Sequence, residues 1–526
     1  MSEHSPNPSI INHLKVLDQK RDDWRETVVE PLAQIGAPAV AGLIERLHLT
    51  VDLDVRQRTA VILGRLGSNA DGAMPALIEC VVDRNRDMRN ESIRALKQID
   101  PNWLTSAAAL SAIPLFIEKL GRRSPNEVHN VAKLALSSIG GPAVPELIRT
   151  LSSSGDDQQQ GLVAETLGRI GSDAASAVSP LNQALSSEHL HVRRLAAEAL
   201  GQLGQAAEPA VTKLLQTLTD ESLGVRGVAA KSLAQIESAF EVAAPAVFRL
   251  LANKFDELRN DAVEALAAMG PGTVPMIVEL LEAPNIENLL QGRLEQLEQD
   301  LKNYQEWVKR RHPNKGELLT QDEFNSIKIS ERWLLEEISS EFDQTVRLAA
   351  IEVLAKIGPP AQEAEPTLLT LLTDERLELR AASAKALAEI RPETSAALNA
   401  LMQTLLDRQE SVRSAAVGAL DAIEPEWRVT PMADQMMDTL IDGMKQGNST
   451  AGAPLVRFGP VAAPKLIGLL RDESRSVRQP AVELLGQMGS DAASAIHALE
   501  EVVATDPHGL VRRAAGEALK QIRQAS

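Results

Sequence analysis

The amino-acid sequence predicts an all-α fold, namely an α-α superhelix (a solenoid) of about fourteen stacked helix pairs. Three observations lead to this prediction. A block that reads VRRLAAEALGQLG at residues 192–204 recurs along the chain, and over most of the chain its arginine returns every 33 or 34 residues. Aromatic residues make up only 2% of the 526 residues, so Ala and Leu must supply most of the core. Repetition at this period is typical of units that bury their apolar faces by stacking.

The repeated block has the spacing of one helix. It recurs as VRQRTAVILGRLG, VRLAAIEVLAKIG and VRQPAVELLGQMG at residues 55–67, 346–358 and 477–489. The apolar residues from Val192 to Leu203 stand three or four positions apart, on one stripe of an α-helix, and Gly204 suits the C-cap. A second apolar segment begins near Pro209, which a first helical turn tolerates. Each unit is therefore predicted to contain two helices, A and B, of which B contains the arginine.

The turn between helices A and B contains a second periodic signal. In six repeats an Asp precedes the arginine by six residues, which predicts a structural ladder: the Asp caps helix B and accepts hydrogen bonds from an Arg of a neighbouring unit. The six pairs are Asp83/Arg89, Asp220/Arg226, Asp374/Arg380, Asp407/Arg413, Asp472/Arg478 and Asp506/Arg512. This combination of Pro, Asp, Val-Arg and Leu-Gly resembles the HEAT repeats, particularly the short bacterial kind known from phycobilisome lyases. The resemblance covers nearly the whole chain and specifies fold strongly and function weakly.

The repeat boundaries divide the chain into four predicted segments. Residues 1–36 form an N-terminal tail and a degenerate capping helix pair, in which Trp24 replaces the usual small residues. HEAT-like repeats occupy residues 37–282 and 344–526, and the last repeat forms a C-terminal cap. Terminal repeats are expected to be atypical because one of their faces has no neighbour.

The remaining segment, residues 283–343, is predicted to be a helical hairpin similar to a coiled coil. The 88 residues between Arg259 and Arg347 exceed one period by 55, and the B helix resumes at Gln344, so the insert lies in one A–B turn. Leucines in residues 290–301 follow a heptad spacing. The aromatic residues either dock the hairpin on the solenoid or form a partner site with its basic tip, since Trp, Tyr and Arg dominate binding hot spots. The candidate partner-binding residues are Tyr304, Trp307, Lys309, Arg310, Arg311, Phe324 and Trp333.

A second irregularity lies at residues 447–459, which read GNSTAGAPLVRFG. The B helix is shortened here, Pro454 interrupts it, and the Val-Arg pair of the repeat is missing. Pro480 stands early in the next B helix, where an interior proline costs about 3 kcal/mol. The segment is either a local bend of the superhelix or a hinge or binding notch.

In HEAT proteins the B helices line the concave face, so the resemblance implies that positions one, five and nine after the arginine are exposed there. Glu recurs at the middle position, beside Gln, Lys or Arg. The row is either a solvated face or a polar, acidic groove for a basic peptide or tail. Its candidate partner-binding residues are Glu165, Glu198, Gln202, Glu264 and Glu352. The same positions in the last two repeats are Gln479, Glu483, Gln487, Arg513, Glu517 and Gln521.

Composition restricts the class of partner and the compartment. The formal net charge of −18 disfavours nucleic acid as a partner and leaves another protein or a basic peptide segment. The single cysteine, Cys80, rules out an intrachain disulfide and suits a reducing compartment. The N-terminus lacks the pattern of a signal peptide. The sequence contains no run of 18 apolar residues, which a membrane-spanning helix would need, so a cytoplasmic location is expected.

Motif searches favour a non-enzymatic protein. The sequence contains no HExxH, cysteine pair, G-x-S-x-G, Walker A or G-x-G-x-x-G motif, so no catalytic residue, metal or cofactor is predicted. Deoxyhypusine hydroxylases are HEAT-like oxidoreductases that hold iron with His-Glu dyads, but none of the nine histidines here is followed by Glu. The predicted function is an interaction scaffold or adaptor that uses the B-helix face and the insert. The alternative that the resemblance implies is a lyase-like or chaperone-like component acting on a partner protein.

Overall fold

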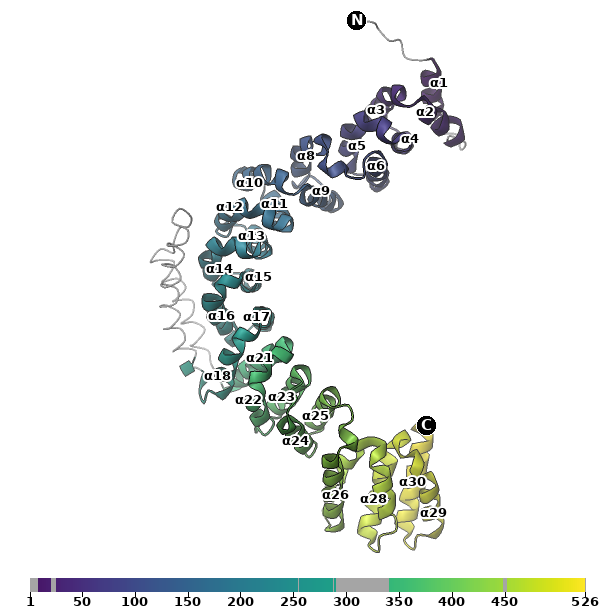
Figure 1. Cartoon of the computed structure of the whole chain (residues 1–526), viewed down its shortest axis with the longest axis vertical. Coiled ribbons are helices and arrows are strands. Elements are labelled where there is room, and N and C mark those ends of the chain that lie inside the picture. The colour runs from purple at the N-terminus through teal and green to yellow at the C-terminus, as the bar shows by residue number, and fades with distance from the viewer. Residues whose placement is uncertain are drawn as a thin grey trace. The chain divides into compact units, whose positions relative to one another are not determined.

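The computed structural model is an all-α solenoid, as predicted, in which helix pairs stack side by side (Figure 1). The structure describes residues 8–19, 25–253, 255–286, 288–289, 340–447 and 452–525, and no strand occurs within these ranges. Trp24 and the insert residues from Tyr304 to Trp333, which we predicted to cap the array or bind a partner, lie outside the described residues. Their roles stay predictions.

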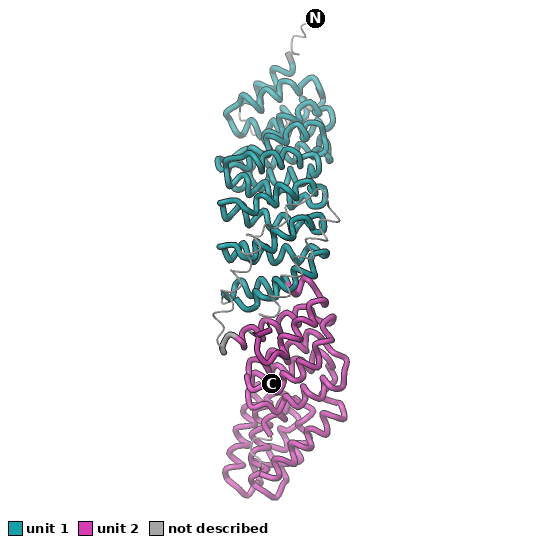
Figure 2. The backbone as a smooth tube through the Cα atoms, turned by 90° about the vertical axis from the view of Figure 1, so that its left-hand side faces the viewer, with its two compact units in different colours: residues 1–265, 291–336 teal, residues 266–290, 337–526 magenta. Residues whose placement is uncertain are grey.

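The chain divides into two compact units (Figure 2). The described residues of unit 1 lie within residues 8–265, and those of unit 2 lie within residues 266–289 and 340–525. The boundary therefore falls inside one helix, Asp256–Met269, whereas we expected the insert to separate the two halves of the array.

Unit 1 contains two layers of helices. The A layer contains α3 (Val40–Leu49), α5 (Met74–Val81), α8 (Ile113–Glu118), α10 (Val144–Ser153), α12 (Val178–Ala184), α14 (Val211–Thr217) and α16 (Phe240–Phe248). The B layer contains α4 (Leu53–Arg65), α6 (Arg86–Ile99), α9 (Asn126–Ile139), α11 (Asp157–Ile170), α13 (Leu190–Gln202), α15 (Leu223–Ala234) and α17 (Asp256–Met269). Within this unit the B layer lies on the inner side of the curve (Figure 1).

Unit 2 repeats the same arrangement. Its A helices are α18 (Val274–Glu282), α22 (Glu365–Leu371), α24 (Ser395–Thr404), α26 (Pro431–Lys445), α27 (Ala463–Leu469) and α29 (Ile496–Thr505). Its B helices are α21 (Ser340–Ile357), α23 (Leu377–Ile390), α25 (Glu410–Ile423), α28 (Arg475–Gln487) and α30 (Gly509–Ala525). Val, Leu, Ile and Ala from both layers form the core, and most of them are fully buried.

Most links from a B helix to the next A helix are short 3-10 segments. Examples are η3 (Gly67–Ala73), η6 (Gly171–Ala177), η7 (Gly204–Ala210) and η14 (Gly489–Ala495). Each begins at a glycine with positive φ, such as Gly204 at 57°, which is the left-handed conformation that ends a helix. Two alanines in each segment are fully buried, so these links pack as part of the array.

The N-terminal cap is irregular. It contains α1 (Pro8–Leu17), a π-helical segment η1 (Arg25–Val29) and the short α2 (Glu30–Ile35). Leu17, Val28 and Leu32 are fully buried, so these segments share a small apolar core. These segments therefore depart from the helix lengths of the later repeats, and their role as a cap stays a prediction.

The two ends of the insert belong to one repeat. Helix α18 before the insert packs against α21 after it, which is the contact that A and B helices make in other repeats. Helix α21 begins at Ser340, four residues before the predicted start at Gln344. This packing explains why α18 belongs to unit 2.

The irregular repeat near Pro454 contains no complete B helix among its described residues. The segment η13 (Ala453–Val461) is a 3-10 helix with a break at Gly459. Phe458 is fully buried, and its ring lies 5.3 Å from the ring of buried Trp427 in the preceding link. Large aromatic side chains thus fill part of the space that a B helix fills elsewhere, which favours a packed local irregularity over an open notch. Helix α28 continues through Pro480.

Candidate partner-binding surface

Four of the six aspartates in the predicted ladder form bonds along the stack. Arg193 donates to both carboxylate oxygens of Asp220 in the next repeat, at 2.7 and 3.0 Å. Equivalent contacts join Arg56 to Asp83, Arg380 to Asp407 and Arg478 to Asp506. Each of these arginines therefore belongs to the repeat before the aspartate that it binds.

The ladder prediction is wrong for the other arginines of the six pairs. Within the part of the chain that the structure describes, four of them contact no carboxylate of another repeat: Arg89, Arg226, Arg413 and Arg512. Arg413 donates to the carbonyl oxygen of Asp407 at 2.7 Å and to the Glu410 carboxylate on its own helix α25. Arg512 on α30 donates to the carbonyl oxygen of Asp506 at 2.6 Å.

The spacing of the ladder explains these exceptions. An arginine binds the aspartate that follows it by 27 or 28 residues, as Arg380 binds Asp407. The residue 27 positions after Arg413 is Leu440, and those after Arg89 and Arg226 are Phe116 and Asn253, so no carboxylate stands there. Arg512 belongs to α30, the last helix that the structure describes. These arginines therefore stabilise only the turn of their own repeat.

The aspartate is not itself the N-cap residue. In each of the six repeats its Oδ1 accepts a hydrogen bond from the backbone N–H two residues later, as Asp506 does from His508 at 2.8 Å. The arginine six residues after the aspartate donates to the carbonyl oxygen of that aspartate in the same turn, as Arg89 does to Asp83 at 2.9 Å. The hydrogen bonds from Arg478 lower the pKa of the Asp506 carboxyl group.

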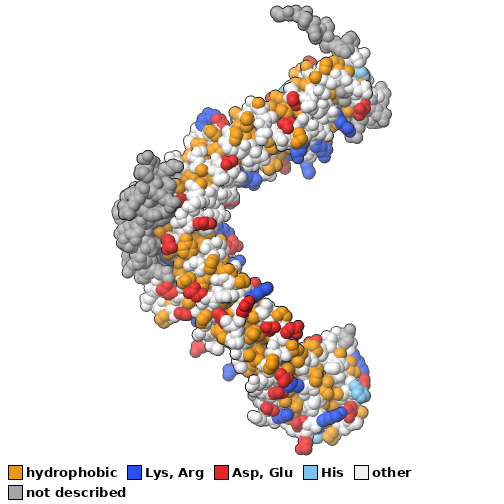
Figure 3. Space-filling model, viewed as in Figure 1, with side chains coloured by type: hydrophobic (Ala, Val, Ile, Leu, Met, Phe, Trp, Pro, Cys, Tyr) orange, Lys and Arg blue, Asp and Glu red, His pale blue; other side chains and the backbone are white. Residues whose placement is uncertain are grey.

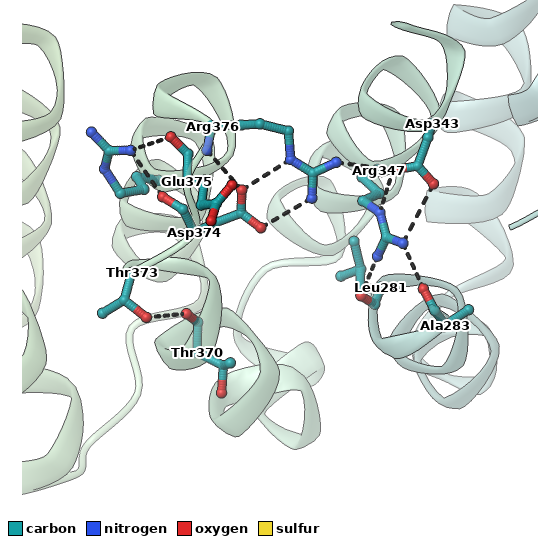
Figure 4. Close-up of polar contacts among 10 residues, drawn as sticks. Leu281, Ala283, Asp343, Arg347, Thr370, Thr373, Asp374, Glu375 and Arg376 are labelled. Carbon is teal, nitrogen blue, oxygen red and sulfur yellow. Dashed lines mark hydrogen bonds and ion pairs between the residues drawn. The ribbon is translucent and has the colours of Figure 1, made fainter. Parts of the chain in front are cut away.

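The ladder changes beside the insert (Figure 4). Arg347 donates to Asp343 and to the carbonyl oxygens of Leu281 and Ala283 at the end of the preceding A helix. Arg376 then joins Asp374 to Asp343, with 2.9 Å contacts to each. Asp343 was assigned to the insert from the sequence, but its side chain belongs to the repeat array.

The carboxylates predicted on the B layer of unit 1 are largely engaged within the array. Both oxygens of Glu165 lie 2.8 Å from the Lys133 ammonium group on the neighbouring helix α9, and Arg169 also donates to them. The Glu165 side chain is only 16% exposed, so it contributes to helix packing and is not a free carboxylate. Glu198 is half-buried and accepts from Gln202 at 3.5 Å.

Glu264 is exposed but also has an interhelical partner. The Lys231 ammonium group on α15 lies 2.6 Å from Glu264 and 2.6 Å from Asp261 on α17. Burial alone lowers the pKa of Lys231, but the hydrogen bonds to the two carboxylates outweigh it and raise the pKa. In unit 2, Glu352 is exposed and lies 3.8 Å from Lys356 on its own helix.

The B layer of unit 1 is not uniformly acidic. Helices α4 and α6 together contain seven Lys or Arg residues and three Asp or Glu residues. Figure 3 shows basic side chains on the side of unit 1 where these helices lie. This part of the B layer is therefore basic, whereas we expected an acidic face. The excess of Asp and Glu over Lys and Arg in the whole chain comes from residues outside α4 and α6.

Helices α28 and α30 form a groove at the C-terminal end of unit 2. Its volume is about 400 Å³. Six of its lining residues are those predicted at the exposed positions of the last two repeats: Gln479, Glu483, Gln487, Arg513, Glu517 and Gln521. Leu510, which is 54% exposed, lines the same groove. The structure therefore brings this part of the predicted row together.

Close approach of neighbouring B helices depends on glycines that sequence reasoning overlooked. A Cβ added to Gly168 would lie 2.8 Å from the Cα of Ala199 on the next B helix, and one added to Gly201 would lie 2.8 Å from the Cα of Ser232. Gly64 and Gly486 are similarly enclosed. The signal was available, because each of these glycines stands three residues before the glycine that ends its helix.

The structure gives Cys80 the environment of a core residue. The side chain is buried on α5, and burial raises the pKa of its thiol despite the nearby Arg56 guanidinium. A protonated, enclosed thiol is a poor nucleophile. Within the described ranges, no group of three or more His, Cys, Asp or Glu residues could hold a metal ion.

A helix that crosses a membrane must be both long and apolar. Across the described segments, no single helix is both long and apolar enough to do so. The adjacent helices Asp256–Met269 and Pro271–Glu282 meet the criterion only when they are counted together across the sharp bend between them.

These layers, links and ladders define an α-helical repeat protein of the solenoid class. Residues 144–234, 331–421 and 449–520 match the family model for HEAT repeats. These segments of the chain therefore contain HEAT repeats. No protein of curated function matches its sequence.

Similar folds occur among solved structures. One is the crystal structure of the karyopherin Kap121p bound to the extreme C-terminus of the protein phosphatase Cdc14p, with 10% identity and a TM-score of 0.36 over 100% of this chain and 80% of that one. Another is importin beta in an ammonium sulfate condition, with 12% identity and a TM-score of 0.35 over 98% of this chain and 82% of that one. At these values the likeness concerns the fold alone.

Proposed function

We propose that this protein is a non-enzymatic interaction scaffold, and that the groove between α28 and α30 binds an extended, basic segment of another protein. The observation that carries the proposal is the groove itself, because residues from equivalent positions of two consecutive repeats line it. A regular row of side chains suits an extended ligand, whose own side chains also recur at a fixed spacing.

The lining chemistry supports a basic ligand. Glu483 and Glu517 are exposed carboxylates that can pair with Lys or Arg, and they outnumber the single cation, Arg513. Gln487 and Gln521 each offer an amide donor and an amide acceptor, which match the N–H and C=O groups of an extended backbone. Leu510 adds an apolar contact. The single cysteine, which is buried, suits a reducing compartment such as the cytoplasm.

A direct test measures binding of a fluorescent Lys/Arg-rich peptide to the full chain. We expect Glu483→Gln combined with Glu517→Gln to weaken binding by about two- to thirty-fold, since each of the two exposed ion pairs contributes about 0.2–1 kcal/mol. Higher ionic strength should weaken wild-type binding further, because salt screens exposed charges. The matched control is Glu363→Gln combined with Glu389→Gln, which removes two exposed carboxylates from the link η11 (Pro359–Ala364) and from α23.

The control variant should bind as the wild type does. Equal losses in both double variants would show attraction to net charge and would overturn the assignment to this groove. Wild-type binding that is insensitive to salt would overturn the electrostatic account. Unfolding curves of both variants would establish that each remains folded, which the exposed positions of all four residues lead us to expect.

A further inference from the structure

The B helices of the first two complete repeats have a net charge opposite in sign to that of the whole chain. Helices α4 and α6 contain seven basic and three acidic residues, whereas the chain has a net charge of −18. Solubility does not require a local excess of positive charge in an acidic protein. Arg56 and Arg89 serve the ladder and the turn of their repeat, so the explanation must concern the remaining basic residues of these helices.

Two of these cations are available to a ligand. Arg65 on α4 and Lys97 on α6 are exposed, and neither makes an ion pair or side-chain hydrogen bond among the residues that the structure describes. Arg94, also exposed, forms a 2.6 Å ion pair with Glu91 on its own helix. Because Gly64 packs against Ala95, Arg65 and Arg94 both neighbour the point where the two helices meet.

The next B helix adds an exposed apolar side chain. Leu134 on α9 is 63% exposed, at the middle position of the exposed row, five residues after His129. The same position is Glu165, Glu198 or Lys231 in the three following repeats. The short segment η4 (Trp103–Thr105) packs against both α6 and α9 and so connects these helices.

We propose that the exposed face of α4, α6 and α9 binds an acidic segment of another protein that also contains a large apolar side chain. Arg65, Arg94 and Lys97 would pair with its carboxylates, and Leu134 would contact its apolar residue. A nucleic acid is disfavoured because the strongly acidic remainder of the chain repels a long polyanion, while an isolated leucine offers it little. The surface lies in unit 1, so it is separate from the groove in unit 2.

The proposal is tested with the full chain and three fluorescent peptides. One contains Glu, Asp and Leu, the second replaces its acidic residues by Gln and Asn, and the third replaces its leucines by Ser. We expect the peptide with Glu, Asp and Leu to bind most tightly, the leucine-free acidic peptide less tightly, and the peptide without acidic residues most weakly. Arg65→Glu combined with Lys97→Glu should weaken binding of the first peptide about ten-fold, because each reversal replaces an attraction by a repulsion.

A matched charge reversal separates this surface from the effect of net charge. Lys385 and Lys520 are exposed residues of B helices in unit 2, and Lys520 occupies the same position in its repeat as Lys97. Lys385→Glu combined with Lys520→Glu should leave affinity for the acidic peptide within about two-fold of wild type. Equal weakening by the two reversals would overturn the proposal.

Leu134→Ser tests the apolar contact. We expect it to weaken binding of the leucine-containing peptide about five-fold, as removal of an exposed apolar contact does, and to leave binding of the leucine-free acidic peptide unchanged. The same loss for both peptides would overturn the apolar part of the proposal.

Tighter binding of oligo-dT than of any peptide, abolished by Arg65→Glu with Lys97→Glu, would assign the surface to nucleic acid instead. None of these variants touches the groove between α28 and α30, so the two proposals fail independently.

Discussion

A methyl group added at Gly201 tests how closely neighbouring B helices approach in this protein. Gly201 lies where α13 packs against α15, and an ideal Cβ there would lie 2.8 Å from Ser232 Cα and 2.7 Å from Ser232 Oγ. Carbon atoms in contact ordinarily lie about 3.5–4.0 Å apart. In Gly201→Ala, the backbone of α15 would therefore have to retreat by roughly 0.7 Å or more, and the buried hydrogen bond from Ser232 to Ala197 would be disturbed.

The size of the effect follows from two opposing contributions. Overpacking a close interface costs about 1–3 kcal/mol. Replacing a glycine inside a helix by alanine stabilises the helix by about 0.5–1 kcal/mol, because the unfolded chain loses freedom. We therefore expect Gly201→Ala to lower the free energy of unfolding by about 1–2 kcal/mol.

Gly418 provides the control. It lies inside α25, is exposed, and an added Cβ would meet no other atom within 4 Å. Gly418→Ala should therefore raise stability by about 0.5–1 kcal/mol, opposite in sign to the change at Gly201. Urea unfolding followed by circular dichroism, with hydrogen exchange of α13 and α15, would measure both, since a repeat array need not unfold in one step. Stabilisation by both alanines would refute the close approach.

Three further predictions follow from the buried ion pair and the thiol. Arg478→Ala, which leaves the buried Asp506 carboxylate without its cation, should destabilise the last repeats by about 3 kcal/mol, seen as faster hydrogen exchange in α30. The pKa of the Asp506 carboxyl group is lower in the folded state than in the unfolded state, where it is about 4. The ionised carboxylate therefore stabilises the fold above about pH 4, and this stabilisation is lost as the pH falls further. On acidification, the urea midpoint of Asp506→Asn should fall less than that of the wild type. Cys80 should react with a thiol reagent at least ten-fold more slowly in the folded chain than in urea, and equal rates would contradict its burial.

The ladder was predictable in part because its members are charged and strictly spaced. An Asp and an Arg at fixed positions of each repeat can be paired from the sequence once the period is known. The pairing fails where the following turn lacks the Asp, as it does after Arg413. Near the insert, Arg347 binds Asp343 and two carbonyl oxygens, because the turn that normally follows an A helix is interrupted. The helical period alone does not indicate which side chain takes over a missing contact.

Neither the exposure of Glu165 nor its availability to a partner was predicted correctly. A 3.6-residue period places Glu165 on the exposed row of the B layer, but it does not reveal that Lys133 of the neighbouring repeat extends across to bind it and leaves it only 16% exposed. Lys133 lies in a repeat whose arginine is replaced by His129, so it was not part of the predicted row. In the groove, by contrast, Glu483 and Glu517 belong to two regular repeats, and prediction and structure agree.

The residues that define the repeats are poor places for partner specificity for a physical reason. Asp506, Arg478 and Gly201 are each committed to a neighbouring helix, so changing them to recognise a ligand would cost stability along the whole stack. Partner specificity must therefore come from positions where contacts between helices do not restrict the residue type. Leu134 departs from the repeat pattern without satisfying any packing requirement that the structure shows, since its side chain is 63% exposed. It is this combination, departure from the repeat together with exposure, that makes the face of α4, α6 and α9 a better candidate for recognition than the ladder beside it.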